Sequence, residues 1–287
     1  MQLPSAKLSD FMNLTKFVFP IFISALVVVG STKAGLIVSY AGAPGDQFST
    51  LQNTNVETFD SFNSSGNNGN VYNNISWQNV GTINQVDVRP ADQYGGSYDG
   101  GSTNSNYAVQ STGPEANETA NTTLTLSKPS AYFGLWWSAG DPANVLDFYS
   151  GGVKGTLVAQ FVTSDLGVLP NAYKGNPTSE FKGFDASEYF AFLNFYANPG
   201  TTWDTIVFSN LADSGFESDN WTSRVEAWGK DPGENGPPPG IIVGEINGDN
   251  LTAVPEPGNA TAMLLFAVAG GLGITGVALR RKKQAEK

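Results

Sequence analysis

Carboxylates are the side chains of this 287-residue chain best suited to chemistry, because the sequence contains no His and no Cys. That absence excludes Ser-His-Asp and Cys-His catalysis, thiol chemistry and disulfides, and it removes the commonest transition-metal ligands. Chemistry by carboxylate, Tyr, Ser or Lys side chains remains open. No spacing marks two carboxylates as a pair across a cleft, so we expect no enzyme and keep a glycan hydrolase only as an alternative.

One acidic pair has a spacing that indicates a metal site. Glu217 and Asp219 lie two residues apart, so an extended chain places both on one side. Ca²⁺ binds about six to eight oxygen ligands of this kind. Glu57 and Asp60 could join the pair, since the first and last strands of a jelly roll often neighbour each other. The sequence predicts a structural Ca²⁺ site made by these four carboxylates, with a solvated acidic turn as the alternative.

Aromatic side chains could bind sugar, because a flat ring packs on the C–H face of a pyranose. The candidates for a sugar-stacking platform are Trp137, Trp203 and Trp221, with Trp136 and Tyr149 beside them. Trp136 and Trp137 point to opposite faces of a strand, so we expect at least one of them in the core. Core packing of the whole set is the alternative.

A Gly-, Ser- and Asn-rich stretch at residues 91–107 contains Asp92, Asp99, Asn104 and Asn106. Such a loop could bind glycan hydroxyls or an ion, or it could be only an exposed loop of turn-forming residues.

Short apolar runs between turn residues predict that residues 35–230 form one all-β domain. Two packed antiparallel sheets, a jelly-roll-like β-sandwich, fit this number of strands. Residues 231–253, rich in Pro and Gly, are predicted to be a spacer, although Ile241–Ile246 could instead be a last strand. The expected strands are Leu36–Tyr40, Ile83–Val88, Thr122–Leu126, Tyr132–Trp137, Val145–Tyr149, Gly155–Phe161, Tyr189–Tyr196, Thr205–Ser209 and Val225–Trp228.

The negative charge of the chain is concentrated in this domain. The whole chain carries −11, while residues 35–254 hold 23 acids and 7 bases, which gives −16, and the two ends together carry +5. A domain of this charge repels phosphates, so we expect no nucleic-acid partner. The charge suits calcium and neutral glycans, or simply solvation.

The N-terminal residues 1–34 read as a signal peptide. Lys7 and Lys16 precede the apolar run Phe17–Gly30, and Thr32 and Ala34 are small residues suited to a cleavage site. A helix of this run spans about 21 Å, short of the roughly 30 Å of a bilayer core. We therefore expect cleavage rather than a permanent anchor.

The C-terminal residues 254–283 carry the most specific pattern. Residues 260–279 are uncharged and long enough for one transmembrane helix. The basic cluster that follows should stay in the cytoplasm, which places the acidic domain outside. The motif before the helix is Val254, Pro255, Glu256 and Pro257, and the basic stop is Arg280, Arg281, Lys282 and Lys283.

This order of motif, apolar helix and basic stop resembles the PEP-CTERM sorting signal of exosortase-dependent bacterial surface proteins. The resemblance implies recognition by a membrane-embedded exosortase, cleavage near the Pro-Glu-Pro, and release or transfer to the cell surface. An ordinary single-pass anchor is the alternative. The stretches FGLWWSAGDPANVLDFYSGG, LNFYANPGTTWDTIVFSN and GFESDNW also resemble a domain of such proteins of cyanobacterial type, and more loosely jelly-roll carbohydrate-binding modules.

Together these features predict an exported protein, anchored in the inner membrane as a precursor and then placed on the cell surface or in the extracellular matrix. We expect a structural or adhesive role, with exosortase, the inner membrane and exopolysaccharide as partners. A carbohydrate-binding module with a structural Ca²⁺ is the main alternative.

Overall fold

The computed structural model describes residues 35–64, 69–96, 105–110, 119, 121–167, 169–212 and 214–253. The predicted signal peptide, sorting motif, transmembrane helix and basic stop lie outside these residues. Within them, no helix is long and apolar enough to cross a membrane.

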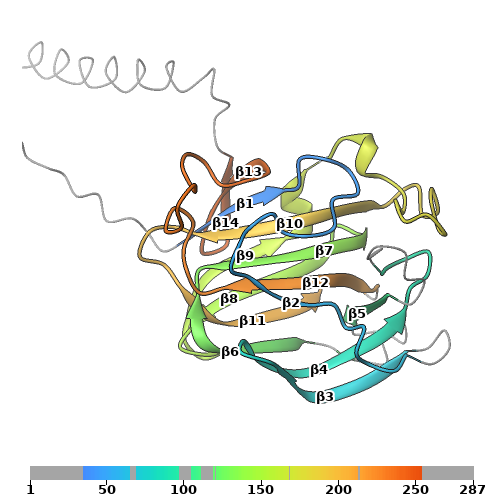
Figure 1. Ribbon diagram of the computed structural model, residues 1–287, viewed down its shortest axis with the longest axis horizontal. Helices are drawn as coiled ribbons and strands as arrows, with labels where there is room; N and C mark the ends of the chain where they lie inside the picture. Colours follow the sequence, from blue (N-terminus) through green and yellow to red (C-terminus); the bar gives the residue numbers. More distant parts are fainter. Residues whose placement is uncertain are drawn as a thin grey trace, which may run out of the picture. The chain divides into compact units, whose positions relative to one another are not determined.

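The described chain is all-β and antiparallel, which confirms this part of the predicted fold class (Figure 1). Two short 3-10 helices are η2 (Thr163–Leu166) and η3 (Asn171–Tyr173). The strands are β1 (Leu36–Tyr40), β2 (Asn55–Glu57), β3 (Asn70–Trp77), β4 (Gly81–Pro90), β5 (Asn106–Gln110), β6 (Thr122–Ser130), β7 (Tyr132–Gly140), β8 (Asn144–Ser150), β9 (Thr156–Val162), β10 (Tyr189–Ala197), β11 (Trp203–Asn210), β12 (Phe216–Arg224), β13 (Ile241–Asn247) and β14 (Asn250–Ala253).

All the strands belong to one hydrogen-bonded sheet, in the order β14-β13-β1-β10-β7-β12-β5-β4-β6-β11-β8-β9, with β2 beside β12 and β3 beside β4. The two ends of this order meet where the backbone N–H of Gln160 donates to the carbonyl of Gly248 (2.7 Å). The sheet is therefore an almost closed barrel. It has a front wall (β1, β10, β7, β12 and β5) and a back wall (β6, β11, β8 and β9) (Figure 1).

Aromatic rings fill the space between the walls. Trp221 of β12 stacks on Phe208 of β11 with ring centroids 4.1 Å apart. The ring centroid of Phe195 of β10 lies 5.1 Å from the ring centroids of both Phe148 of β8 and Phe161 of β9. Such large, edge-on and stacked rings stabilise a core strongly and fix the separation of the walls.

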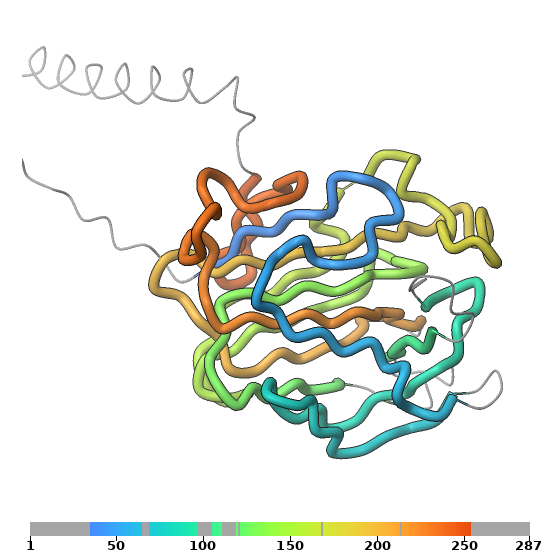
Figure 2. Tube along the Cα trace, in the orientation of Figure 1, coloured from blue at the N-terminus to red at the C-terminus, as the bar shows by residue number. Residues whose placement is uncertain are grey.

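The outer face of the front wall is also covered. The segment after β1 crosses in front of the strands (Figure 2). Two hydrogen bonds hold this segment against the front wall. Tyr132 Oη donates to Ser49 Oγ (2.8 Å), and Asn220 Nδ2 donates to the carbonyl of Gln47 (2.9 Å). Trp136 and Trp137 face opposite sides of the front wall, as predicted. Both are buried, because each side is covered, and they belong to separate apolar clusters.

Two predicted boundaries are wrong. Val225–Trp228 is not a strand, whereas the polar segment before it forms β12. Residues 231–253 are not only a spacer, because β13 pairs with β1, β14 pairs with β13, and Ile246 is fully buried. The alternative of a last strand at Ile241–Ile246 is confirmed by β13. The folded domain therefore extends to Ala253.

This boundary predicts that a chain ending at Gly240 is less stable than one ending at Ala253. Loss of the buried Ile246 side chain alone should lower the free energy of unfolding by about 1.5–3 kcal/mol. Urea unfolding of the two chains, each starting at Gly35, measures the difference. Equal unfolding midpoints would show that β13 and β14 are not part of the fold.

Candidate functional site

Arg224, the last residue of β12, organises the loop that follows it. Its side chain is buried, and its Nε and Nη2 donate to the carbonyls of Glu226 and Ala227, both at 2.9 Å. Nη2 also donates to Glu234 Oε2 at 3.0 Å, and Nη1 to Glu234 Oε1. A two-bond contact of this kind fixes direction as well as distance.

The carboxylate of Glu234 also binds backbone N–H groups of the loop. Its Oε2 also accepts hydrogen bonds from the backbone N–H of Gly229 (2.9 Å) and of Asp231 (3.3 Å). The Arg224 side chain, and then these backbone donors, lower the pKa of Glu234 to about 2. The carboxylate therefore stays ionised at neutral pH, which maintains its ion pair with Arg224.

Trp228 is the side chain that this loop presents. Its Nε1 donates to the carbonyl of Gly236 (3.1 Å), and its half-buried ring meets the edge of Tyr196 with centroids 6.3 Å apart. The ring lines a groove of about 450 Å³, which we call the Trp228 groove. Other lining residues include Ile37, Tyr196, Asn198, Lys230 and Pro238.

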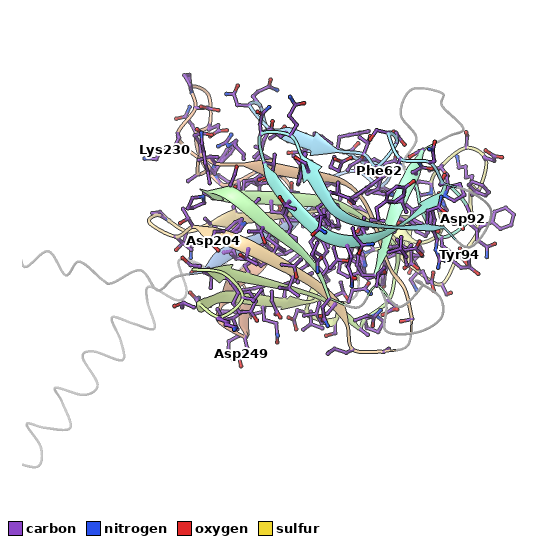
Figure 3. The ribbon with its side chains drawn as sticks, turned by 90° about the horizontal axis from the view of Figure 1, so that it is seen from below. Phe62, Asp92, Tyr94, Asp204, Lys230 and Asp249 are labelled. Carbon is purple, nitrogen blue, oxygen red and sulfur yellow. The ribbon has the colours of Figure 1, made fainter. Side chains whose placement is uncertain are left out.

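The Trp228 groove has the character of a ligand site. Its wall is largely apolar, its aromatic ring is fixed by hydrogen bonding, and no Asp or Glu lines it. Lys230 extends outward at this end of the domain (Figure 3). A concave apolar surface with a few polar groups of fixed position is typical of small-molecule and sugar sites.

The three predicted sugar-stacking tryptophans do not form a platform. Trp137, Trp203 and Trp221 are 2%, 0% and 0% exposed, so none offers a ring face to a ligand. They lie on the inward face of their strands, where Trp137 Nε1 donates to Asn144 Oδ1 (2.7 Å). The prediction that these three residues stack on sugar is therefore wrong. The aromatic residue that lines a groove is Trp228, which the sequence did not indicate as a candidate. Its neighbours Gly229 and Lys230 show no strand alternation, a signal that could have placed it in a loop.

The predicted Ca²⁺ ligands are not brought together as one site. Glu57 Oε1 accepts from the N–H of Phe59 (3.0 Å), Asp60 Oδ1 from the N–H of Asn106 (2.7 Å), and the buried Asp219 from Ser105 Oγ (3.3 Å). Across the residues that the structure describes, no three acidic side chains are grouped as metal ligands. The four-carboxylate prediction is therefore wrong.

Glu217 lies in different surroundings from Asp219. Burial raises its pKa well above the usual range, and the negative charges of Asp141 and Glu188 raise it further. A bulge in β12 after Asp219, where Asn220 has a φ of 49°, interrupts the regular pairing with β7.

Asn106 donates hydrogen bonds to oxygens of the turn that contains Asp60. Its Nδ2 donates to the carbonyls of Phe59 (3.2 Å) and Phe62 (2.8 Å), while its backbone N–H bonds the Asp60 carboxylate. The oxygens of this turn thus have N–H donors of the protein itself. Of the other loop candidates, Asp92 accepts from Tyr107 Oη (3.0 Å), and Asp99 and Asn104 lie outside the described residues.

These contacts predict that stability depends on Asn106 and not on calcium. Asn106→Ala should lower the free energy of unfolding by about 1–3 kcal/mol, because the buried carbonyl of Phe59 and the partly buried carbonyl of Phe62 lose their donor. The exposed Asn235→Ala should change it by less than about 0.5 kcal/mol. Thermal unfolding with a chelator and with excess Ca²⁺ should give the same Tm. A Tm that falls in chelator would restore the metal site.

Glu188 is a second carboxylate, after Glu217, whose pKa is raised by burial. Burial, followed by the charges of Asp185 and Asp141, raises its pKa from 4.5 to about 7. The folded chain therefore binds a proton that the unfolded chain has lost, and stability falls as pH rises from about 4.5 to about 7. Neither Glu188 nor Glu217 lines the Trp228 groove.

Glu188→Gln should therefore raise Tm above about pH 7 and leave it unchanged below about pH 4.5. A domain of this size gains about 2–4 °C for each kcal/mol recovered. The exposed Glu180→Gln, in the same loop, removes the same charge and is the control. Equal gains in the two variants would show that net charge, and not the burial of Glu188, sets the pH dependence.

Comparison of this chain with protein families, with curated proteins and with solved structures finds no match.

Proposed function

We propose that this chain is an exported, non-enzymatic surface or matrix protein whose β-domain binds polysaccharide in the Trp228 groove. The observation that carries the proposal is the preformed groove: a buried arginine and an ionised glutamate hold the loop, and the loop presents a tryptophan ring. A ring held in place before binding loses little entropy when a sugar stacks on it.

The sorting part of the proposal comes from the sequence. The PEP-CTERM-like segment begins at Val254, directly after β14 ends at Ala253. Cleavage near Pro257 would then leave every strand of the domain intact. This boundary agrees with a processing step outside the fold, performed by an exosortase at the membrane.

The strand order supports a jelly roll, the finer fold that we propose. Strands β5 to β12 run β10-β7-β12-β5 in the front wall and β6-β11-β8-β9 in the back wall. Consecutive strands mostly alternate between the walls, as in the eight-stranded jelly rolls of many lectin domains. A lectin-like scaffold is compatible with sugar binding but does not by itself imply it.

The groove part of the proposal predicts that Trp228→Ala weakens polysaccharide binding by at least about tenfold, since stacked aromatic residues dominate such contacts. A glycan array followed by calorimetry with the best ligand measures this loss. Tyr94→Ala removes an exposed ring far from the groove and should bind as the wild type does. Equal affinities for the two variants would reject the groove as the sugar site.

The sorting part predicts a specific mature chain. Mass spectrometry of the secreted protein should show an N-terminus near Gly35 and a C-terminus near Pro257. A mature form that retains residues 260–279 would contradict sorting, while leaving the groove to be judged by its own experiment.

A further inference from the structure

A second cleft lies at the other end of the domain from the Trp228 groove. It has a volume of about 620 Å³ and lies between the segment after β1 and the loop before β10; we call it the lysine cleft. Its lining includes Pro44, Gln47, Lys174, Asn176, Thr178 and Lys182. Asn176 Nδ2 donates to the carbonyls of Asp92 (3.3 Å) and Gln93 (3.1 Å). Figure 3 shows Asp92 and Tyr94 at the end opposite Lys230.

The wall of the lysine cleft is built by specific hydrogen bonds. Asn176 is 1% exposed, and its Oδ1 accepts from the N–H (2.9 Å) and the Oγ1 (2.6 Å) of Thr178. Tyr173 Oη donates to the carbonyl of Ala41 (2.7 Å), which ties the loop to the segment after β1. The loop is thereby joined to two other parts of the chain.

Lys174, one of the residues that line this cleft, also contacts an aromatic ring. Its Nζ lies 5.2 Å from the ring centroid of Tyr189, and Tyr189 stacks on the buried Trp137 with centroids 6.4 Å apart. The backbones of Lys174 and Tyr189 also form an isolated β-bridge. A cation held over a ring in this way is attracted to the ring face and keeps its place.

The charge distribution distinguishes the lysine cleft from the rest of this acidic domain. Five lysines occur in the part of the chain that the structure describes, and none makes an ion pair there, whereas both arginines do. Lys174 and Lys182 line the lysine cleft, and Lys230 lines the Trp228 groove. No Asp or Glu lines either cleft, so the charged side chains in their walls are Lys174 and Lys182 in the lysine cleft and Lys230 in the groove.

We propose that the lysine cleft binds an anionic sugar unit, with a carboxylate or sulfate group between Lys174 and Lys182. The volume suits a small ring, and the polar side chains around the lysines suit its hydroxyls. The net negative charge of the domain disfavours extended polyanions such as nucleic acid, whereas the charged side chains that line this cleft are the two lysines. The site extends the proposed polysaccharide binding and uses none of the groove residues.

Calorimetric titration tests this site with a hexuronate oligosaccharide and its carboxyl-reduced, neutral counterpart. Lys174→Ala/Lys182→Ala should weaken hexuronate binding by about tenfold or more, since bonds to charged groups are strong. Lys128→Ala/Lys154→Ala removes the same charge elsewhere and should bind as the wild type does. Equal hexuronate affinities for the two double variants would overturn the proposal, as would equal wild-type affinity for the acidic and neutral ligands.

Two further variants test the lysine cleft independently of the groove and with a smaller change to the fold. Trp228→Ala should keep the lysine-dependent part of hexuronate binding, so the two sites can fail independently. Lys182→Ala alone leaves the Lys174–Tyr189 contact in place and should still weaken binding. A sulfated, carboxyl-free oligosaccharide that loses affinity in the lysine double variant supports the site and extends it to sulfate. A wild type that binds neither anionic oligosaccharide overturns it.

Discussion

The ion pair of Arg224 with Glu234 is the interaction on which the candidate site depends. Arg224 ends β12, a strand of the front wall, and its buried guanidinium needs partners because an unpaired buried charge costs about 3–5 kcal/mol. Glu234 and two loop carbonyls supply them. The requirement to satisfy one charge thus determines the path of a loop otherwise rich in Gly and Pro. The position of Trp228 follows from that path.

The aromatic core makes the walls a rigid frame for both clefts. Lys230 of the groove and Asp92, whose carbonyl binds Asn176 of the lysine cleft, lie at opposite ends of the domain (Figure 3). The two proposed sites on one domain could hold two polysaccharide chains or two parts of one chain, and linked sites bind more strongly than either alone. Such an arrangement would suit a matrix protein, which must connect polymers and need not transform them.

Most strands could be predicted because their apolar residues alternate locally, as in Thr122–Leu126 of β6. The sequence does not predict β12 because most of its buried residues are polar: Asp219 and Asn220 are fully buried, and Asn220 Nδ2 donates to the distant carbonyl of Gln47. The prediction of sugar stacking by Trp137, Trp203 and Trp221 was wrong because residue type alone does not show whether a ring faces the core or the solvent. Asn106 lies 46 residues from Asp60 in sequence, so no spacing rule could show that its backbone N–H is the partner of the Asp60 carboxylate.

Amide hydrogen exchange in Glu234→Gln tests the central claim most directly. This substitution keeps the shape of the side chain and removes the charge that gathers the loop. The account predicts that amides of residues 226–238, Gly229 above all, lose protection while those of β7 and β12 keep theirs. Unchanged protection throughout the loop would show that the ion pair does not hold Trp228 in place, and the preformed groove would have to be abandoned.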